Sequence, residues 1–144
     1  ASRTELLLEL GLRLCHTPSS SELGSFLLLQ LFADVEGVRG EILSCVFDNL
    51  AQEDLHTRRP LWVAMLQRIA SRHLLALNAL AHRLVDWSCC LASLPLSAGM
   101  QVLHALLPLV TVSIEFGRHL LLLLRKYLAS PEARHRKLAV HGFA

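Results

Sequence analysis

Apolar residues recur at helical spacing along most of the chain, and short polar clusters separate the apolar runs. Leu6, Leu7, Leu10 and Leu14, for example, would share one face of a helix. The same spacing predicts helices over about 4–15, 20–33, 35–51, 60–71, 73–92 and 114–129. Another helix is expected between Ser97 and Pro108, and a last one runs from Ser130-Pro131-Glu132 to the end. The pattern therefore predicts an all-α chain.

Polar residues at the predicted helix starts indicate how those helices are capped. Ser19 with Glu22 fits a capping box for the helix over 20–33, and Asp34 is the expected N-cap of the next helix. Ser97 is the candidate N-cap of the helix expected between Ser97 and Pro108. Pro108 would end or kink that helix. Ser130-Pro131-Glu132 combines a cap, a proline and an acid at a helix start.

Helices of this length joined by short polar turns favour antiparallel helix pairs. No strict repeat period is visible, so the best architecture is an irregular HEAT-like α-solenoid segment, in which each pair covers the apolar flank of its neighbour. A closed helical bundle is the alternative. The chain starts and stops inside helical patterns, as expected of a piece of a longer protein.

Composition supports a packed helical chain, because 53% of its residues are hydrophobic and only 18% are charged. The net charge of +2 is too small to predict nucleic-acid binding. Its distribution is uneven: residues 1–114 hold 8 basic and 10 acidic side chains (net −2), whereas residues 115–144 hold 6 and 2 (net +4). The positive charge is therefore concentrated at the C-terminal end.

No catalytic, cofactor or metal motif is present, so the chain is not expected to be an enzyme. Cys15, Cys45, Cys89 and Cys90 lack a metal-ligand spacing, and we interpret them as reduced packing residues. The longest stretch without charged residues contains Pro95 and Pro108, which argue against a membrane span.

The predicted helix over 114–129 has an unusual distribution of side chains. Arg118 and Arg125 share the side opposite its wide apolar face, which consists of Phe116, Leu120, Leu123, Leu124 and Tyr127. Leu121, Leu122 and Leu128 fall on the outer half, so we expect this helix to be covered on both sides, by neighbouring repeats or by a partner. The alternative is a central core helix whose Lys126 reaches out to water.

Arg134, Arg136 and Lys137 follow on the next predicted helix, close in sequence to Arg118 and Arg125. Aligned on adjacent helices, these five side chains could neutralise several phosphates of a DNA duplex. The alternative is an ordinary charged edge of a solenoid.

Several short runs resemble the Fanconi anaemia complementation group I family. The resemblance covers roughly residues 23–144 and is carried by Leu23-Gly24, Glu41-Ile42-Leu43, Leu94-Pro95-Leu96, Leu124-Arg125-Lys126 and the run from Arg136 to Phe143. It implies that residues 1–22 end one solenoid segment and that residues 23–93 form a helical domain. Residues 94–144 would then start the following solenoid segment, which contains the predicted helix over 114–129 with the ubiquitin acceptor.

The resemblance also implies a nuclear, non-enzymatic role without a cofactor. Family members pair with the paralogous group D-two Fanconi protein and clamp duplex or branched DNA during interstrand crosslink repair. The acceptor of ubiquitin would be Lys126, modified by the pathway's conjugating enzyme with the core-complex ligase. Its apolar flank, with Leu122 and Tyr127, would then meet the partner. Two alternatives remain at this stage: a generic HEAT-like interaction scaffold without a DNA function, and a free-standing helical bundle.

Overall fold

The computed structural model of the chain describes residues 2–52 and 59–143, and these residues contain helices but no strand. The α-helices are α1 (Arg3–His16), α2 (Ser21–Asp34), α3 (Arg39–Ala51), α4 (Arg59–Arg72), α5 (Leu74–Ala79), α6 (Ala81–Trp87), α7 (Leu96–Leu106), α8 (Ile114–Leu128) and α9 (Ala133–Phe143). Short 3₁₀ helices lie between them: η1 (Pro18–Ser20), η2 (Glu36–Val38), η4 (Ser88–Ser93) and η5 (Leu107–Thr111). The predicted all-α class is confirmed.

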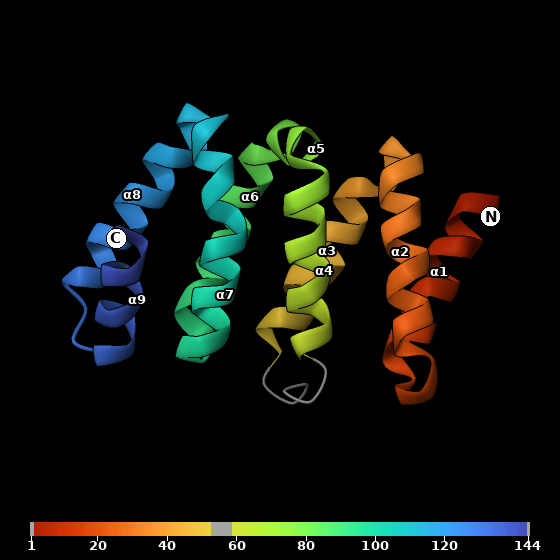
Figure 1. Cartoon of the computed structure of the whole chain (residues 1–144), viewed down its shortest axis with the longest axis horizontal. Helices are drawn as coiled ribbons and strands as arrows, with labels where there is room; N and C mark the ends of the chain where they lie inside the picture. The colour runs from red at the N-terminus through yellow and green to blue at the C-terminus, as the bar shows by residue number, and fades with distance from the viewer. Residues whose placement is uncertain (1, 53–58, 144) are drawn as a thin grey trace.

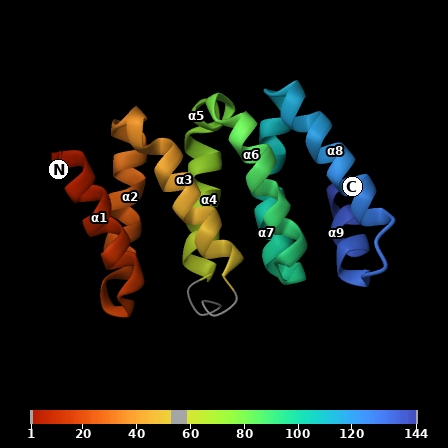
Figure 2. The ribbon, with the colours of Figure 1, turned by 180° about the vertical axis from the view of Figure 1, so that it is seen from behind.

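The long helices stand side by side in two layers (Figure 1). One layer contains α2, α4, α7 and α9, in which each helix packs on the next. The other contains α1, α3, α6 and α8 and faces the viewer in Figure 2. The chain advances along the row from one end to the other, so the two termini lie far apart. This open row is the α-solenoid expected from the sequence, and the closed bundle is excluded.

The core lies between the two layers and consists almost entirely of aliphatic and aromatic side chains. The largest fully buried residues include Phe32 of α2, Trp62 of α4 and Phe116 of α8. The spacing over 35–51 predicts a buried stripe of Val38, Ile42, Cys45, Val46 and Leu50; all are buried except Cys45, which is half-buried, and Leu43 is buried as well. Because the core continues along the row, each helix pair is stabilised chiefly by the apolar surface of its neighbours.

The first pair is held together by a close approach of two backbones. A Cβ atom at Gly24 of α2 would collide with the backbone N of Cys15 in α1 and would lie 2.8 Å from the carbonyl oxygen of Gly11. Only a glycine lets the two helices cross at this distance. The α1–α2 contact is accordingly one of backbone against backbone.

Four of the expected helix starts differ in the structure, the fourth being that of α9, which begins at Ala133, so that Ser130 and Pro131 precede the helix. Ser19 does not cap α2, since Ser20 occupies the N-cap position and makes no capping hydrogen bond with its side chain. Asp34 is the last residue of α2 rather than a cap, because η2 precedes α3. Helix α7 begins at Leu96, so that Pro95 rather than Ser97 stands at its N-cap. At α2, α3 and α7 a 3₁₀ helix or a proline leads into the α-helix, and the helix starts without a hydrogen bond to a capping side chain.

The single helix predicted over 73–92 is also wrong, since the chain forms α5, α6 and η4 there. The break falls at Leu80, whose φ of −106° and ψ of 14° are outside the helical range. After the break Trp87 stacks on Phe47, with the ring centroids 5.3 Å apart, and Leu77 and Leu84 are both fully buried. Tertiary packing outweighs local helical periodicity in this segment.

Within the described ranges, no helix is both long enough and apolar enough to cross a membrane.

Candidate functional site

Helix α8 presents the apolar face that its sequence predicts. Phe116, Leu120, Leu124 and Tyr127 are buried against the rest of the row, and Leu123 is partly buried. The helix begins at a side-chain cap that the sequence analysis did not assign: the Oγ of Ser113 accepts a hydrogen bond from the backbone N–H of Phe116 at 3.2 Å. The orientation of α8, and with it the position of Lys126, is therefore fixed by both its core face and its first turn.

The outer half of α8 is open to solvent within this chain, so the expected cover on this side is left to a further repeat or to a partner. Leu121, Leu122 and Leu128 are 40%, 61% and 43% exposed. The reason is the place of α8 in the row: within the described residues it packs on α6, η5 and α9, and these lie on its inner side.

Lys126 lies near the end of α8 and is exposed. It has no ion-pair partner among residues 2–52 and 59–143. Its side chain lines an open groove of about 480 Å³ formed by α8, η4 and the turn before α9. The other residues lining this groove are Cys89, Ala92, Leu123, Tyr127, Ala129, Ser130, Pro131 and His135. The amine therefore stands at the edge of a mainly apolar groove, where a second protein can reach it.

Tyr127 does not lie on the surface where the sequence analysis expected a partner contact. It is buried, and its ring stacks on His135 with the centroids 5.1 Å apart. It thus belongs to the wall of the Lys126 groove and holds α9 against α8. Leu122 is the exposed residue of the pair, so a partner covering α8 would meet Leu122 and not Tyr127.

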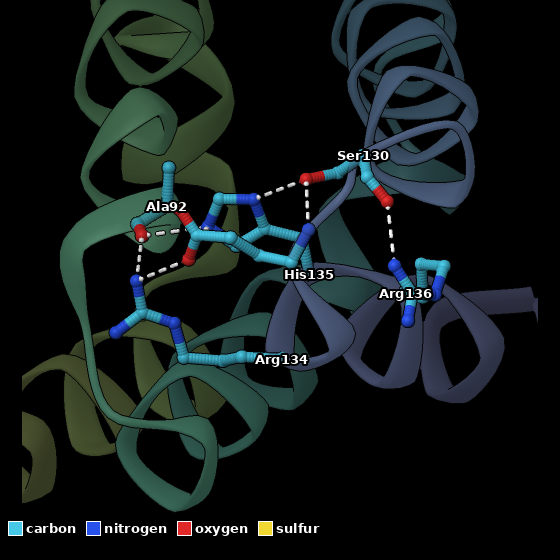
Figure 3. A network of polar contacts seen from close by, with 6 residues as sticks. Ala92, Ser130, Arg134, His135 and Arg136 are labelled. Atoms are coloured by element: carbon cyan, nitrogen blue, oxygen red, sulfur yellow. Dashed lines mark hydrogen bonds and ion pairs between the residues drawn. The ribbon is translucent and has the colours of Figure 1, made fainter.

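A polar network fastens the start of α9 to η4 beside this groove (Figure 3). The ring of His135 bonds on one side to the Oγ of Ser130 at 3.0 Å and on the other to the carbonyl oxygen of Ala92 at 2.9 Å. One Nη of Arg134 donates to the same carbonyl at 3.0 Å and to Glu132 at 3.1 Å. Arg136 donates to the carbonyl oxygen of Ser130 at 2.8 Å.

These contacts involve two of the five basic residues that the sequence suggested for DNA binding, namely Arg118, Arg125, Arg134, Arg136 and Lys137. Two of the five, Arg134 and Arg136, already donate hydrogen bonds to backbone carbonyls of the chain itself. Arg118 and Arg125 are exposed on α8, whereas Lys137 lines a different groove, of about 350 Å³, between α7 and α9. The five side chains therefore come from two helices of different layers, α8 and α9.

A second basic surface escaped the sequence analysis. Arg68 and Arg72 are exposed on α4 and line a groove between α2 and α4 together with the partly buried His73. Arg68 also lines a second groove, to which α2 contributes the acid Glu22. Helices α4, α7 and α9 contain six Lys and Arg residues and no Asp or Glu, whereas each of α1, α3, α6 and α8 contains at least one acid. This absence of acids was readable in the sequence, but only the structure shows that the three helices are neighbours in one layer.

The cysteines divide by environment. Cys15 is buried and Cys45 half-buried, and burial raises the pKa of both thiols, that of Cys15 to about 11. Cys89 is exposed in the Lys126 groove, so it is not the packing residue that we expected. The side chain of Cys90 lies outside the part of the chain that the structure describes.

Comparison with known proteins supports the arrangement seen in the fold. The model of a family described as FANCI solenoid 2 matches residues 13–144. The chain belongs to this family. It is also similar to the Fanconi anemia group I protein of Gallus gallus, with 29% identity over 136 residues, which make up 93% of this chain and 10% of that protein. The chain thus spans about a tenth of the length of this curated relative.

Membership of the FANCI solenoid 2 family confirms the resemblance drawn from the short runs around Lys126 and at the C-terminal end. It also agrees with the open row of helix pairs, since a solenoid is built by stacking such pairs. This FANCI solenoid 2 chain thus has two candidate functional surfaces: the groove of Lys126, and the layer formed by the acid-free helices α4, α7 and α9.

Proposed function

We propose that this FANCI solenoid 2 chain is a non-enzymatic segment of a Fanconi anaemia protein that receives one ubiquitin on Lys126. In this proposal the protein acts in the nucleus, in the repair of DNA interstrand crosslinks. It forms a heterodimer with the paralogous group D-two protein, and the two clamp duplex or branched DNA. The conjugating enzyme of the pathway and its core-complex ligase attach the ubiquitin.

The exposure of Lys126 beside an open groove is the observation that carries the proposal. Conjugation requires an amine that can reach the thioester of the conjugating enzyme. Lys126 meets this requirement, because it is exposed and no carboxylate of the described residues holds it. The neighbouring Leu122 gives a partner an apolar surface to cover, which would make the access to Lys126 depend on the state of the complex.

The chain offers a complete internal control, because Lys126 and Lys137 are its only two lysines. We would incubate the 144-residue chain with ubiquitin, its activating enzyme and the conjugating enzyme and ligase of the pathway. Lys126→Arg should abolish the modification, and Lys137→Arg should leave it unchanged. Mass spectrometry of the digested product locates the isopeptide bond. Modification that persists in Lys126→Arg, or that disappears in Lys137→Arg, would refute the assignment.

The acid-free helices α4, α7 and α9 favour DNA as the second partner. Their exposed basic side chains, Arg68 and Arg72 of α4 and Arg136 and Lys137 of α9, face solvent on the same layer of the row. No carboxylate on these three helices opposes them. A phosphate backbone laid along this layer would meet positive charge on α4 and on α9, whereas α2, at the other end of the layer, carries Glu22 and Asp34. Contact with such basic side chains is the sequence-independent component of DNA binding.

A salt titration with the full chain separates this role from that of a generic scaffold. Each phosphate contact contributes about −0.9 to the slope of log K against log salt for duplex DNA. Arg68→Glu with Arg72→Glu, and Arg136→Glu with Lys137→Glu, should each flatten the slope by about 2 on this rule. Arg118→Glu with Arg125→Glu, on the other layer, is the matched control and should change the slope least. Equal effects of all three pairs would argue for non-specific charge and hence for the scaffold.

A further inference from the structure

The chain contains one Ser-Pro and one Thr-Pro dipeptide, and they lie in different surroundings. The five prolines follow Thr17, Arg59, Leu94, Leu107 and Ser130. Ser130-Pro131 lies outside helical structure, in the turn that joins α8 to α9, where Ala129, Pro131 and Glu132 are all exposed. A serine followed by proline in an exposed turn has the form of a substrate for a proline-directed protein kinase.

The hydroxyl of Ser130 is surrounded by groups that bind anions. Its Oγ accepts a hydrogen bond from the backbone N–H of Glu132 at 3.2 Å and lies 3.0 Å from Nδ1 of His135. The guanidinium of Arg136 reaches the carbonyl oxygen of the same serine at 2.8 Å (Figure 3). Ser130 also lines the open groove of Lys126, so its side chain can be reached from solvent. By contrast, the hydroxyl of Thr17 donates to the carbonyl oxygen of Arg13, an acceptor that would repel a phosphate.

We infer that Ser130 is a phosphorylation site and that Arg136 and His135 bind the phosphate once it is attached. The kinase transfers the γ-phosphoryl group of ATP: the bond from the γ-phosphorus to the β–γ bridging oxygen breaks, a bond to Oγ forms, and ADP leaves. The hydroxyl proton passes to the base of the kinase. The product carries close to two negative charges and three acceptor oxygens. Arg136, whose guanidinium is bonded to the carbonyl oxygen of the same serine, would turn from that carbonyl to the phosphate. The inference does not depend on ubiquitin transfer to Lys126.

The phosphate would also change the state of His135. Ala92 offers only a carbonyl oxygen, so Nε2 must carry the proton that makes the 2.9 Å bond. In the neutral ring Nδ1 is then an acceptor, and the Ser130 hydroxyl donates a hydrogen bond to it. An ionised phosphate has no proton to give, so Nδ1 must itself become a donor. Phosphorylation therefore favours the imidazolium form of His135, held between the phosphate and Ala92, with Glu132 at 3.6 Å from Nε2.

The first test is incorporation of phosphate into the full 144-residue chain by a recombinant mitogen-activated protein kinase with Mg²⁺ and ATP. Mass spectrometry should place the phosphate on Ser130. Ser130→Ala and Pro131→Ala should abolish this phosphorylation. Ser130→Thr should still be phosphorylated at position 130, and Thr17→Ala should be phosphorylated like the normal chain. Circular dichroism of each variant checks that the helices are retained. A chain that stays unmodified on Ser130 while the standard peptide of the kinase is phosphorylated, or a Pro131→Ala chain modified at the normal rate, would overturn the inference.

The second test asks whether the phosphate is bound. The ¹⁵N signal of Nδ1 of His135 should shift on phosphorylation, because this nitrogen would change from acceptor of the Ser130 hydroxyl to donor to the phosphate. Phosphorylation should raise the urea midpoint of the normal chain, and this gain should disappear in Arg136→Gln. A spectrum of His135 that is unaffected by phosphorylation, together with an equal midpoint in Arg136→Gln, would mean that the phosphate only projects into solvent and would refute the binding role of these residues.

Discussion

The Nε2 atom of His135 lies 2.9 Å from the carbonyl oxygen of Ala92, a contact that ties α9 to η4 across 43 positions of sequence. The ring of His135 is also stacked on Tyr127 and bonded to Ser130. The imidazole of His135 thus joins α9 to α8 through Tyr127, to the turn before α9 through Ser130, and to η4 through Ala92. The geometry of the Lys126 groove depends on this ring, because His135 and Tyr127 form part of its wall.

We predict that His135→Ala lowers the free energy of unfolding by about 1–3 kcal/mol, since it removes the hydrogen bond and the stacked ring. Arg134→Ala should cost less, about 0–1 kcal/mol, because its side chain is 39% exposed and its ion pair with Glu132 is screened by solvent. His104→Ala is the control, since His104 is exposed on α7 and should change stability by no more than about 0.5 kcal/mol. Urea unfolding measures all three, and an equal loss in His135→Ala and His104→Ala would contradict the structural role.

Gly24→Ala should destabilise the chain through the α1–α2 crossing. A methyl group at this position would meet the backbone of α1, which cannot move aside as a flexible side chain can. Overpacking of this kind costs about 1–3 kcal/mol, and the upper end is expected here. At Gly37 a Cβ would have no atom within 4 Å, so Gly37→Ala should be neutral or slightly stabilising. Thermal unfolding of the two variants side by side tests the crossing, and a neutral Gly24→Ala would show that the helices can separate without cost.

Sequence periodicity predicted the helices best where one apolar face dominates. The limits of α8 and the burial of Phe116, Leu120, Leu124 and Tyr127 follow from spacing alone, because a helix that must bury one stripe has little choice of orientation. The same rule failed over 73–92. There, Leu74, Leu77, Leu80, Ala81 and Leu84 also fit the apolar face of one continuous helix, so spacing did not reveal the break at Leu80.

The candidate site was predicted less completely, for reasons that lie in long-range packing. The exposure of Lys126 agrees with its polar neighbours on α8, but whether Tyr127 is covered by a partner or by His135 depends on a residue eight positions later. From the sequence we interpreted Arg134 and Arg136 as free to bind phosphate. Their acceptors are the backbone carbonyl oxygens of Ala92 and Ser130, and the type of residue does not indicate that its carbonyl accepts such a bond. Arg68 became a candidate only when α4 and α9 were found in the same layer.

The thiols should differ in reactivity by their burial. In a Cys90→Ser chain, Cys89 should react first with a maleimide at pH 8, because it is exposed. Cys15 should be the slowest, since it is buried and its pKa of about 11 leaves only about one thiolate in a thousand at that pH. Cys45 should fall between them, because burial, with Asp48 and Glu41 nearby, raises its pKa. Peptide mapping at several times gives the order, and early labelling of Cys15 would show that α1 opens readily.

The same shift predicts a loss of stability in alkali. Burial raises the pKa of Cys15 above its ordinary value of 9.0, so the folded chain holds this proton more tightly than the unfolded chain does. The contribution of Cys15 is therefore fully present below pH 9.0 and declines as the pH rises toward about 11. Cys15→Ala should show a smaller loss over this interval. Identical pH slopes for the two chains in urea unfolding would contradict the burial of this thiol.

Arg39 should be more important for stability than its place on the surface of the row suggests. Its Nε donates to the carbonyl oxygen of Phe32 at 2.7 Å and one Nη donates to Ala33 at 3.1 Å, which satisfies two of the free carbonyls at the end of α2. The guanidinium also lies 5.6 Å from the centre of the Phe32 ring. We expect Arg39→Met to cost about 1.5–3 kcal/mol, the range for hydrogen bonds to a charged group.

Arg39→Lys should restore only part of this stability, because an ammonium cannot reproduce the planar fork that reaches both carbonyls. Arg83 provides the comparison, since its guanidinium lies 4.8 Å from the centre of the Trp87 ring and no carbonyl bond is assigned to it within residues 2–52 and 59–143. Arg83→Met should therefore cost about 0.5–1 kcal/mol, the contribution of an exposed cation–π contact alone. If the two Met variants unfold at the same urea concentration, the carbonyls of α2 are satisfied equally well by water, and Arg39 is not a structural cap.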